Sequence, residues 1–135
     1  MTPREREANL SMLAEELNVA VHLCRSMSWD RSMSYGNRVG IGWNGSAKSY
    51  FAGLHELGHC AHGHFNGPQT GRSLEKEAQA WEWAMEHNQG SDTALRELAA
   101  SCLGSYLAVG TGGAGSAYQR IAPMVGLNAE AGRRS

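Results

Sequence analysis

The chain has 135 residues and a mass of 14.6 kDa, the size of a single domain with one hydrophobic core. Its net charge of −1 argues against binding to nucleic acid or to an anionic membrane through overall charge. The apolar runs are far shorter than a membrane span, and the polar N-terminal stretch is unlike a signal peptide. We therefore expect a cytoplasmic protein whose three widely spaced cysteines, Cys24, Cys60 and Cys102, are reduced core thiols.

The first half of the chain predicts a helix, two short strands and a second helix. Residues 3–17 place leucines at helical spacing between charged residues, with a proline in the first turn. Residues 19–23 and 37–43 contain β-branched or aromatic residues between turn-forming stretches, which is typical of strands. Residues 47–63 predict a helix that carries a cluster of histidines. The expected fold class is α+β, with helices packed on a short β-sheet.

The second half of the chain predicts two more helices and an irregular end. Ser73 is the expected N-cap of a helix that ends near Gly90, and a further helix is expected over 93–108. Glycines and short apolar pieces predict a loosely ordered C-terminal tail, 111–135, after a main domain that spans 1–110.

The histidine cluster contains a zinc-binding motif. Residues 55–59 read HELGH and match the H-E-x-x-H pattern. His55 and His59 lie one helical turn apart on the same face, so both imidazoles can reach one zinc ion. Glu56 lies beside His55 on the helix, where it can flank the ion and accept a proton from a metal-bound water. The motif therefore predicts a zinc site with Glu56 as general base.

A catalytic zinc needs a third protein ligand and one open position for water. The metzincin pattern would place glycine at 62 and histidine at 65, where this chain has His62 and Phe65, so that class is excluded. His62 is also about 10 Å from His55 along the helix axis, too far to share its ion. We expect His62 and His64 to lie at the rim of the site or behind its ligands.

The best candidate for the third ligand lies on the helix that follows Ser73. Glu77 shares an apolar stripe of that helix with Leu74 and Trp81. A carboxylate in such a stripe is unfavourable unless it is paired or bound to metal. Three further glutamates of the helix lie off this stripe: Glu75, Glu82 and Glu86. Glu77 is therefore predicted to be the third zinc ligand.

The HELGH motif, followed by an E-A-x-x-W-x-W-A segment over 77–84, resembles the ImmA/IrrE family of small zinc metallopeptidases. The resemblance covers roughly residues 49–85. It implies a zincin-like metallopeptidase domain in which the second motif supplies the third zinc ligand. Trp81 occupies the position of an aspartate in thermolysin-like enzymes, which favours the smaller family. By resemblance, the substrate is a regulatory protein, often a helix-turn-helix repressor of a phage or mobile element, and cleavage is site-specific.

This ligand set predicts peptide hydrolysis, in which zinc lowers the pKa of its water to about 7 and Glu56 accepts the proton. The group that stabilises the oxyanion is open among His62, His64, Tyr35 and Tyr50. One alternative is a non-catalytic zinc-holding domain that binds a protein partner. Another is a nucleic-acid-binding accessory protein with an accidental motif, which the charge balance argues against. The oligomeric state is left open.

Overall fold

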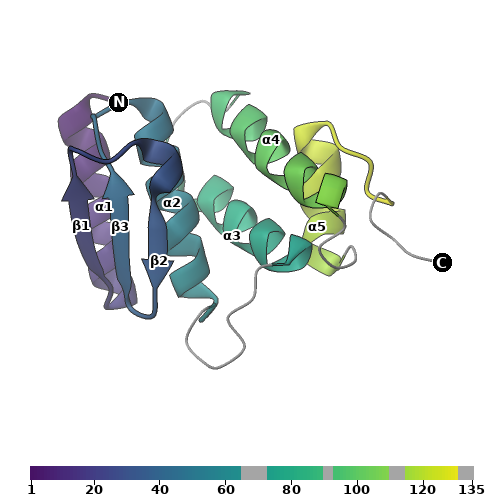
Figure 1. Ribbon diagram of the computed structural model, residues 1–135, viewed down its shortest axis with the longest axis horizontal. Coiled ribbons are helices and arrows are strands. Elements are labelled where there is room, and N and C mark those ends of the chain that lie inside the picture. The colour runs from purple at the N-terminus through teal and green to yellow at the C-terminus, as the bar shows by residue number, and fades with distance from the viewer. Residues whose placement is uncertain (65–72, 90–92, 110–114, 131–135) are drawn as a thin grey trace.

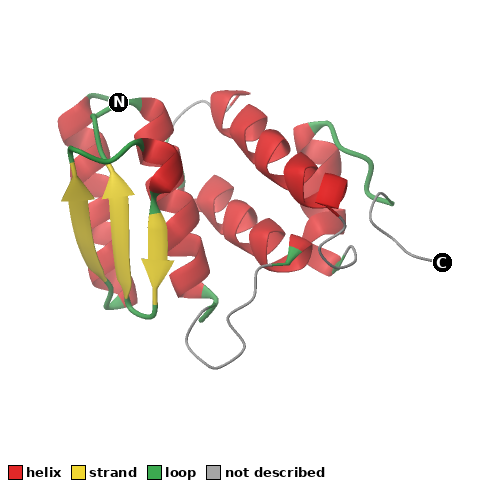
Figure 2. Ribbon diagram, in the orientation of Figure 1, coloured by secondary structure: helices red, strands yellow, loops and turns green. Residues whose placement is uncertain are grey.

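The computed structural model describes residues 1–64, 73–89, 93–109 and 115–130 (Figure 1). Helices pack against a three-stranded mixed sheet, so the expected α+β class is confirmed (Figure 2). In chain order the elements are α1 (Pro3–Leu17), β1 (Ala20–Cys24), the 3-10 helix η1 (Trp29–Arg31), β2 (Met33–Tyr35), β3 (Arg38–Gly42), α2 (Ala47–Ala61), α3 (Leu74–His87), α4 (Thr93–Val109), α5 (Ser116–Ile121) and the 3-10 helix η2 (Ala122–Val125). Among the described residues, no helix has the length and apolar character that a membrane span requires.

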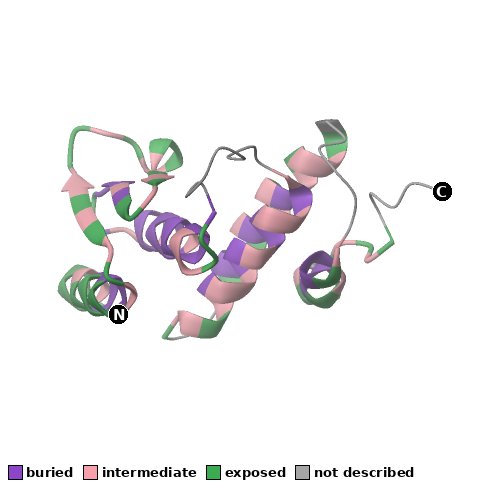
Figure 3. Cartoon of the chain, turned by 90° about the horizontal axis from the view of Figure 1, so that it is seen from below, coloured by how far each residue is buried: buried purple, intermediate pink, exposed green. Residues whose placement is uncertain are grey.

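The sheet has the strand order β1-β3-β2, with β3 parallel to β1 and antiparallel to β2. The two predicted strands correspond to β1 and β3, whereas β2 was not predicted because three residues are too few for an alternating pattern to appear. Val39 and Ile41 of β3 are buried, and Ile41 meets Leu10 of α1 beside Gly53 of α2. The two helices α1 and α2 therefore pack against the same face of the sheet (Figures 1 and 3).

Helix α2 occupies the centre of the molecule, and its residues are buried along most of its length (Figure 3). The helix begins after Ser46, whose hydroxyl accepts a hydrogen bond from the backbone N–H of Ser49. It ends at Ala61, two residues before the predicted end, and Gly63 follows in the left-handed conformation with φ of 68°. This central position makes α2 a rigid support for the side chains of the HELGH motif.

Helix α3 begins after the predicted N-cap, Ser73, and ends at His87, before Gly90, which lies outside the described residues. It packs closely on α2 because both helices carry small residues at their contact. A methyl group added at Gly58 of α2 would lie 2.5 Å from the carbonyl oxygen of Ala80 in α3. The HELGH motif therefore lies where α2 is in close contact with the backbone of α3.

The C-terminal end differs from the loosely ordered tail that was expected over 111–135. Within it, residues 115–130 contain α5 and η2, and Tyr118 and Ile121 are buried in the same core as the preceding helices. The carboxylate of Glu75 in α3 accepts hydrogen bonds from the backbone N–H groups of Ala117 and Tyr118 at 2.9 and 3.0 Å. A six-residue helix is too short to show a clear periodicity, and this distant carboxylate stabilises its N-terminus.

Candidate metal centre

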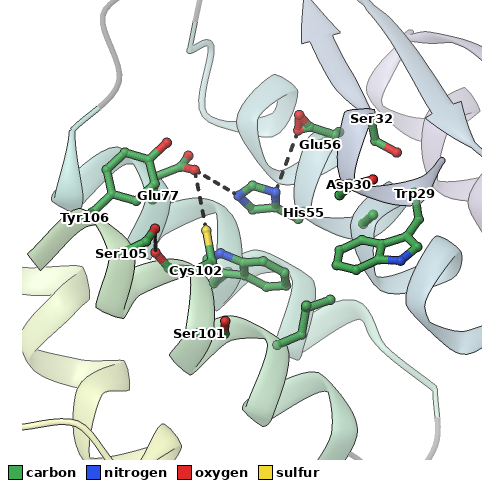
Figure 4. Close-up of a pocket in the computed structure, with 13 residues that line it drawn as sticks. Trp29, Asp30, Ser32, His55, Glu56, Glu77, Ser101, Cys102, Ser105 and Tyr106 are labelled. Carbon is green, nitrogen blue, oxygen red and sulfur yellow. Dashed lines mark hydrogen bonds and ion pairs between the residues drawn. The ribbon is translucent and has the colours of Figure 1, made fainter. Parts of the chain in front are cut away.

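The structure brings together His55 and His59 of α2 with Glu77 of α3. The Nε2 atom of His55 lies 3.5 Å from one carboxylate oxygen of Glu77, and the Nε2 atom of His59 lies 2.5 Å from the other. The two imidazole rings have their centroids 4.6 Å apart. Both histidines therefore direct a ring nitrogen toward the carboxylate of Glu77, one to each of its oxygens, as Figure 4 shows for His55.

Glu77 lies at this point because of its position on the buried face of α3. Its side chain is 1% exposed, and on this helix it is the one buried glutamate. Glu75 holds the N-terminus of α5, and Glu82 forms an ion pair with Arg120 near the surface. Glu86 is exposed. The helical stripe therefore distinguishes the carboxylate that enters the site from the three that do not.

Trp81 fixes the orientation of the His55 imidazole. The two rings stack with centroids 4.2 Å apart and an angle of 13° between their planes. Trp81 is itself buried one turn after Glu77 on α3. The stacked indole covers one face of the imidazole, whose Nε2 lies toward Glu77 and whose Nδ1 lies toward Glu56.

The electrostatic environment favours a neutral His59 beside an ionised Glu77. Burial lowers the pKa of His59 to about 4, so its imidazole is neutral at physiological pH and has a lone pair available for a metal. Burial alone would raise the pKa of Glu77, but hydrogen bonding from His55 and His59 outweighs burial and holds that pKa well below its usual range. A buried anion between two imidazoles is a favourable set of donors for a divalent cation.

Nε2 of His55 is buried and makes no hydrogen bond of good geometry within the described part of the chain, and its contact with the Glu77 carboxylate is 3.5 Å long. Buried polar atoms are normally hydrogen-bonded, because leaving one unpaired costs about 1–3 kcal/mol. Nitrogen and oxygen ligands of one tetrahedral zinc lie roughly 3.3 Å apart, given metal–ligand distances of about 2.0–2.1 Å. The 3.5 Å separation of His55 and Glu77 fits this value, and His59 fits after a shift of under about 1 Å. The residues present therefore fit a zinc ion.

Glu56, the predicted general base, lies on the other side of His55 from Glu77 (Figure 4). Its Oε2 atom is 3.7 Å from Nδ1 of His55, and the residue is 3% exposed. Both carboxylates line a cavity of about 380 Å³ beside the histidine. Glu56 lies near Nδ1 of His55, whereas Glu77 lies near Nε2 of the same ring. Glu56 is thus placed to exchange a proton with a molecule in the cavity.

The cavity lies between the HELGH helix and two other parts of the chain. One wall comes from the region of η1, and the opposite wall comes from α4, while α2 and α3 form the floor (Figure 4). The residues of the η1 wall are Trp29, Asp30 and Ser32, and those of the α4 wall are Leu98, Ser101, Cys102, Ser105 and Tyr106. The volume of about 380 Å³ lies within the range of small-ligand pockets.

The four candidates for oxyanion stabilisation do not line the cavity. His64 lies behind His59, with 2.9 Å between their Nδ1 atoms, and its Nε2 atom is 2.8 Å from the side-chain oxygen of Gln79. It therefore holds the imidazole of His59 in place from behind. His62 is exposed and stacks on His64.

The two tyrosine candidates are also placed away from the cavity. Tyr50 is buried, and its hydroxyl lies 2.5 Å from the side-chain nitrogen of Asn9. Tyr35 is 78% exposed on β2. The tyrosine that does line the cavity is Tyr106 of α4, whose ring lies beside Glu77 in Figure 4. Sequence reasoning missed it because the pattern of α4 does not reveal where this helix docks.

Cys102 is a second residue of α4 that sequence reasoning did not place in the site. Its Sγ atom lies 3.8 Å from Oε1 of Glu77. One ligand atom from each of His55, Glu77 and Cys102 lies within 4.8 Å of the others. All three cysteines are partly buried and none forms a disulfide. The place of Cys102 on the apolar stripe of α4 predicts a buried side chain. An ordinary core thiol has the same pattern, so the sequence does not distinguish the two.

Neither a protein-family model, nor a curated protein, nor a solved structure matches this chain. The family resemblance therefore stays a prediction that rests on the two motifs. The geometry of His55, Glu56, His59 and Glu77 is the structural basis on which a function can be proposed.

Proposed function

We propose that the protein is a zinc-dependent, site-specific endopeptidase that cleaves a regulatory protein. The observation that carries the proposal is the convergence of both HELGH histidines on a buried carboxylate from a neighbouring helix, at 3.5 and 2.5 Å. Two histidines and one glutamate are a ligand set of catalytic zinc sites, which keep one position open. We also propose that the fold is zincin-like, an assignment supported by the motifs and their resemblance.

In this proposal His55, His59 and Glu77 hold the zinc ion. When bound there, zinc supplies a Lewis acid and lowers the pKa of a water molecule to about 7. Trp81 and His64 keep the two imidazoles oriented through stacking and through the contact between Nδ1 atoms. The chain therefore contributes a preformed set of donors, which reduces the reorganisation needed on binding.

Glu56 is the general base of the proposed reaction. Its carboxylate accepts a proton from a water molecule in the cavity and later donates it to the leaving amine. The position of Glu56 on the cavity wall, 3.7 Å from the ring of His55, supports this role. Tyr106 lines the same cavity, and we assign its hydroxyl as the donor to the carbonyl oxygen of the substrate.

The proposed substrate is a transcriptional regulator, in particular a helix-turn-helix repressor of a phage or mobile element. The family resemblance supports this class. A cavity of about 380 Å³ in a chain of 135 residues provides little surface for recognising many sequences. We therefore expect specificity to come from docking one folded partner and cutting an exposed loop or linker.

The test compares wild-type protein with Glu56→Gln and with Glu86→Gln, a matched change at an exposed position of α3. Each protein is incubated with zinc and with regulators encoded near its gene, and the products are identified by mass spectrometry. We expect wild type and Glu86→Gln to cut one regulator at one position, with casein cut slowly if at all. Glu56→Gln should keep its zinc and its fold and lose cleavage by several orders of magnitude, because an amide cannot accept the proton.

Three outcomes would contradict parts of the proposal. Cleavage by Glu56→Gln at the wild-type rate would remove Glu56 from its role. A zinc-loaded wild type that binds its regulator and leaves it intact would instead support the non-catalytic alternative, a zinc-holding domain that acts by binding. Many cuts in unrelated proteins would retain the peptidase and overturn the regulatory substrate.

A further inference from the structure

Cys102 extends from α4 toward the carboxylate of Glu77, from the side of the cavity opposite to Glu56 (Figure 4). We propose that Cys102 is a fourth zinc ligand, which closes the site until the sulfur leaves the metal. The inference rests on the zinc site of the proposed function, and it concerns the regulation of that site. It assigns α4 the role of controlling access to the metal.

The distances support coordination by the sulfur atom. A sulfur and an oxygen bound to one tetrahedral zinc lie roughly 3.5 Å apart, because the metal–sulfur distance is about 2.3 Å and the metal–oxygen distance about 2.0 Å. Sγ of Cys102 is 3.8 Å from Oε1 of Glu77, and that oxygen is 3.5 Å from Nε2 of His55. Both separations are within a few tenths of an ångström of those that a shared ion requires.

A second observation distinguishes this cysteine from an ordinary core thiol. Its sulfur belongs to a cluster of possible metal ligands, in which one ligand atom from each of His55, Glu77 and Cys102 lies within 4.8 Å of the other two. Cys60, by comparison, directs its sulfur toward the backbone carbonyl of Gly36 at 3.6 Å. The sulfur of Cys102 is thus the one that lies beside buried atoms suited to hold a cation.

The number of protein ligands decides what the site can do. With three, a tetrahedral zinc has one position for water, whereas with four the site is closed and resembles a structural zinc site. Thiolate is also a strong ligand for zinc. Docking of the proposed protein substrate against α4 would have to move Cys102 away before water and the peptide reach the metal. The closed state would protect other proteins from cleavage.

The test replaces zinc with cobalt(II), whose bond to a thiolate gives a sulfur-to-metal absorption band in the near ultraviolet. Wild type, Cys102→Ser, Cys102→Ala and the control Cys60→Ala are titrated with cobalt chloride under reducing conditions. We expect the band in wild type and Cys60→Ala and its loss in both Cys102 variants. Removing a side chain that only hydrogen-bonds to a metal ligand lowers metal affinity about 10–100-fold. Removing a ligand itself should cost at least as much, so Cys102→Ser should lose at least about tenfold in zinc affinity.

The outcomes separate this inference from the proposed function. Cobalt binding without a thiolate band, or a band that survives in Cys102→Ser, would overturn the role of Cys102 and leave the histidine and glutamate site intact. Absence of cobalt and zinc binding would overturn both. A second measurement is alkylation by iodoacetamide: zinc should protect Cys102 and chelator should remove the protection, with Cys24 as an internal control. Equal labelling of Cys102 in both states would contradict the inference.

Discussion

Gly58 lies inside the HELGH motif, where α2 is in close contact with the backbone of α3. A Cβ atom at this position would lie 2.5 Å from the carbonyl oxygen and 2.9 Å from the Cα atom of Ala80. Ordinary carbon contacts are about 3.5–4.0 Å, so the helices must separate by roughly 1 Å to admit the methyl group. The obstacle is backbone, which cannot rotate away as a flexible side chain would.

The magnitude of the effect of Gly58→Ala follows from two opposing terms. Alanine stabilises a helix interior by up to about 1 kcal/mol relative to glycine. Overpacking of a well-packed contact costs about 1–3 kcal/mol. We therefore expect a net decrease of about 1–2 kcal/mol in the free energy of unfolding. Because Glu77 moves with α3, we also expect a weaker affinity for zinc.

Gly104→Ala is the matched control for this substitution. It lies in α4, and a Cβ atom there would meet nothing within 4 Å. It should raise the free energy of unfolding by up to about 1 kcal/mol. Urea denaturation of chelator-treated proteins measures both changes, and competition with a zinc indicator measures affinity. If Gly58→Ala is as stable as Gly104→Ala and binds zinc like wild type, the close contact between α2 and α3 is not as described.

Three further predictions follow from individual contacts. Glu75→Ala should lower the free energy of unfolding by about 1–3 kcal/mol and speed hydrogen exchange in α5, whereas Glu82→Ala, which breaks a pair near the surface, should cost at most about 1 kcal/mol. Zinc at a hundredfold excess over its dissociation constant should stabilise wild type by about 2.7 kcal/mol in denaturation experiments, and His59→Ala should abolish that effect. His64→Ala should lower zinc affinity about 10–100-fold because it frees a ligand to rotate, and His62→Ala should leave it unchanged.

Much of the architecture around the site is encoded in local patterns. The spacing of HELGH places two histidines on one face of α2, and the stripe on α3 identifies the glutamate that is buried. These are properties of single helices, which periodicity describes well. The start of α3 follows in the same way from Ser73, because its hydroxyl accepts the backbone N–H of Lys76.

Features that depend on contacts between distant segments were not predictable. Strand β2 forms because β3 offers it an edge, and α5 is stabilised by a carboxylate more than forty positions away, in Glu75. The positions of Cys102 and Tyr106 beside Glu77 depend on how α4 docks against α3, which no pattern within α4 determines. A short element or an apolar stripe is compatible with several partners, and only the folded core selects one.

The central claim is that one zinc ion is held by His55, His59 and Glu77. Elemental analysis of purified wild type, Glu77→Ala and Glu86→Ala tests it most directly, because the two variants lose the same group from the same helix, one from the buried face and one from the surface. We predict close to one equivalent of zinc in wild type and Glu86→Ala, and loss of most of it in Glu77→Ala. Full zinc occupancy in a folded Glu77→Ala protein would contradict the account.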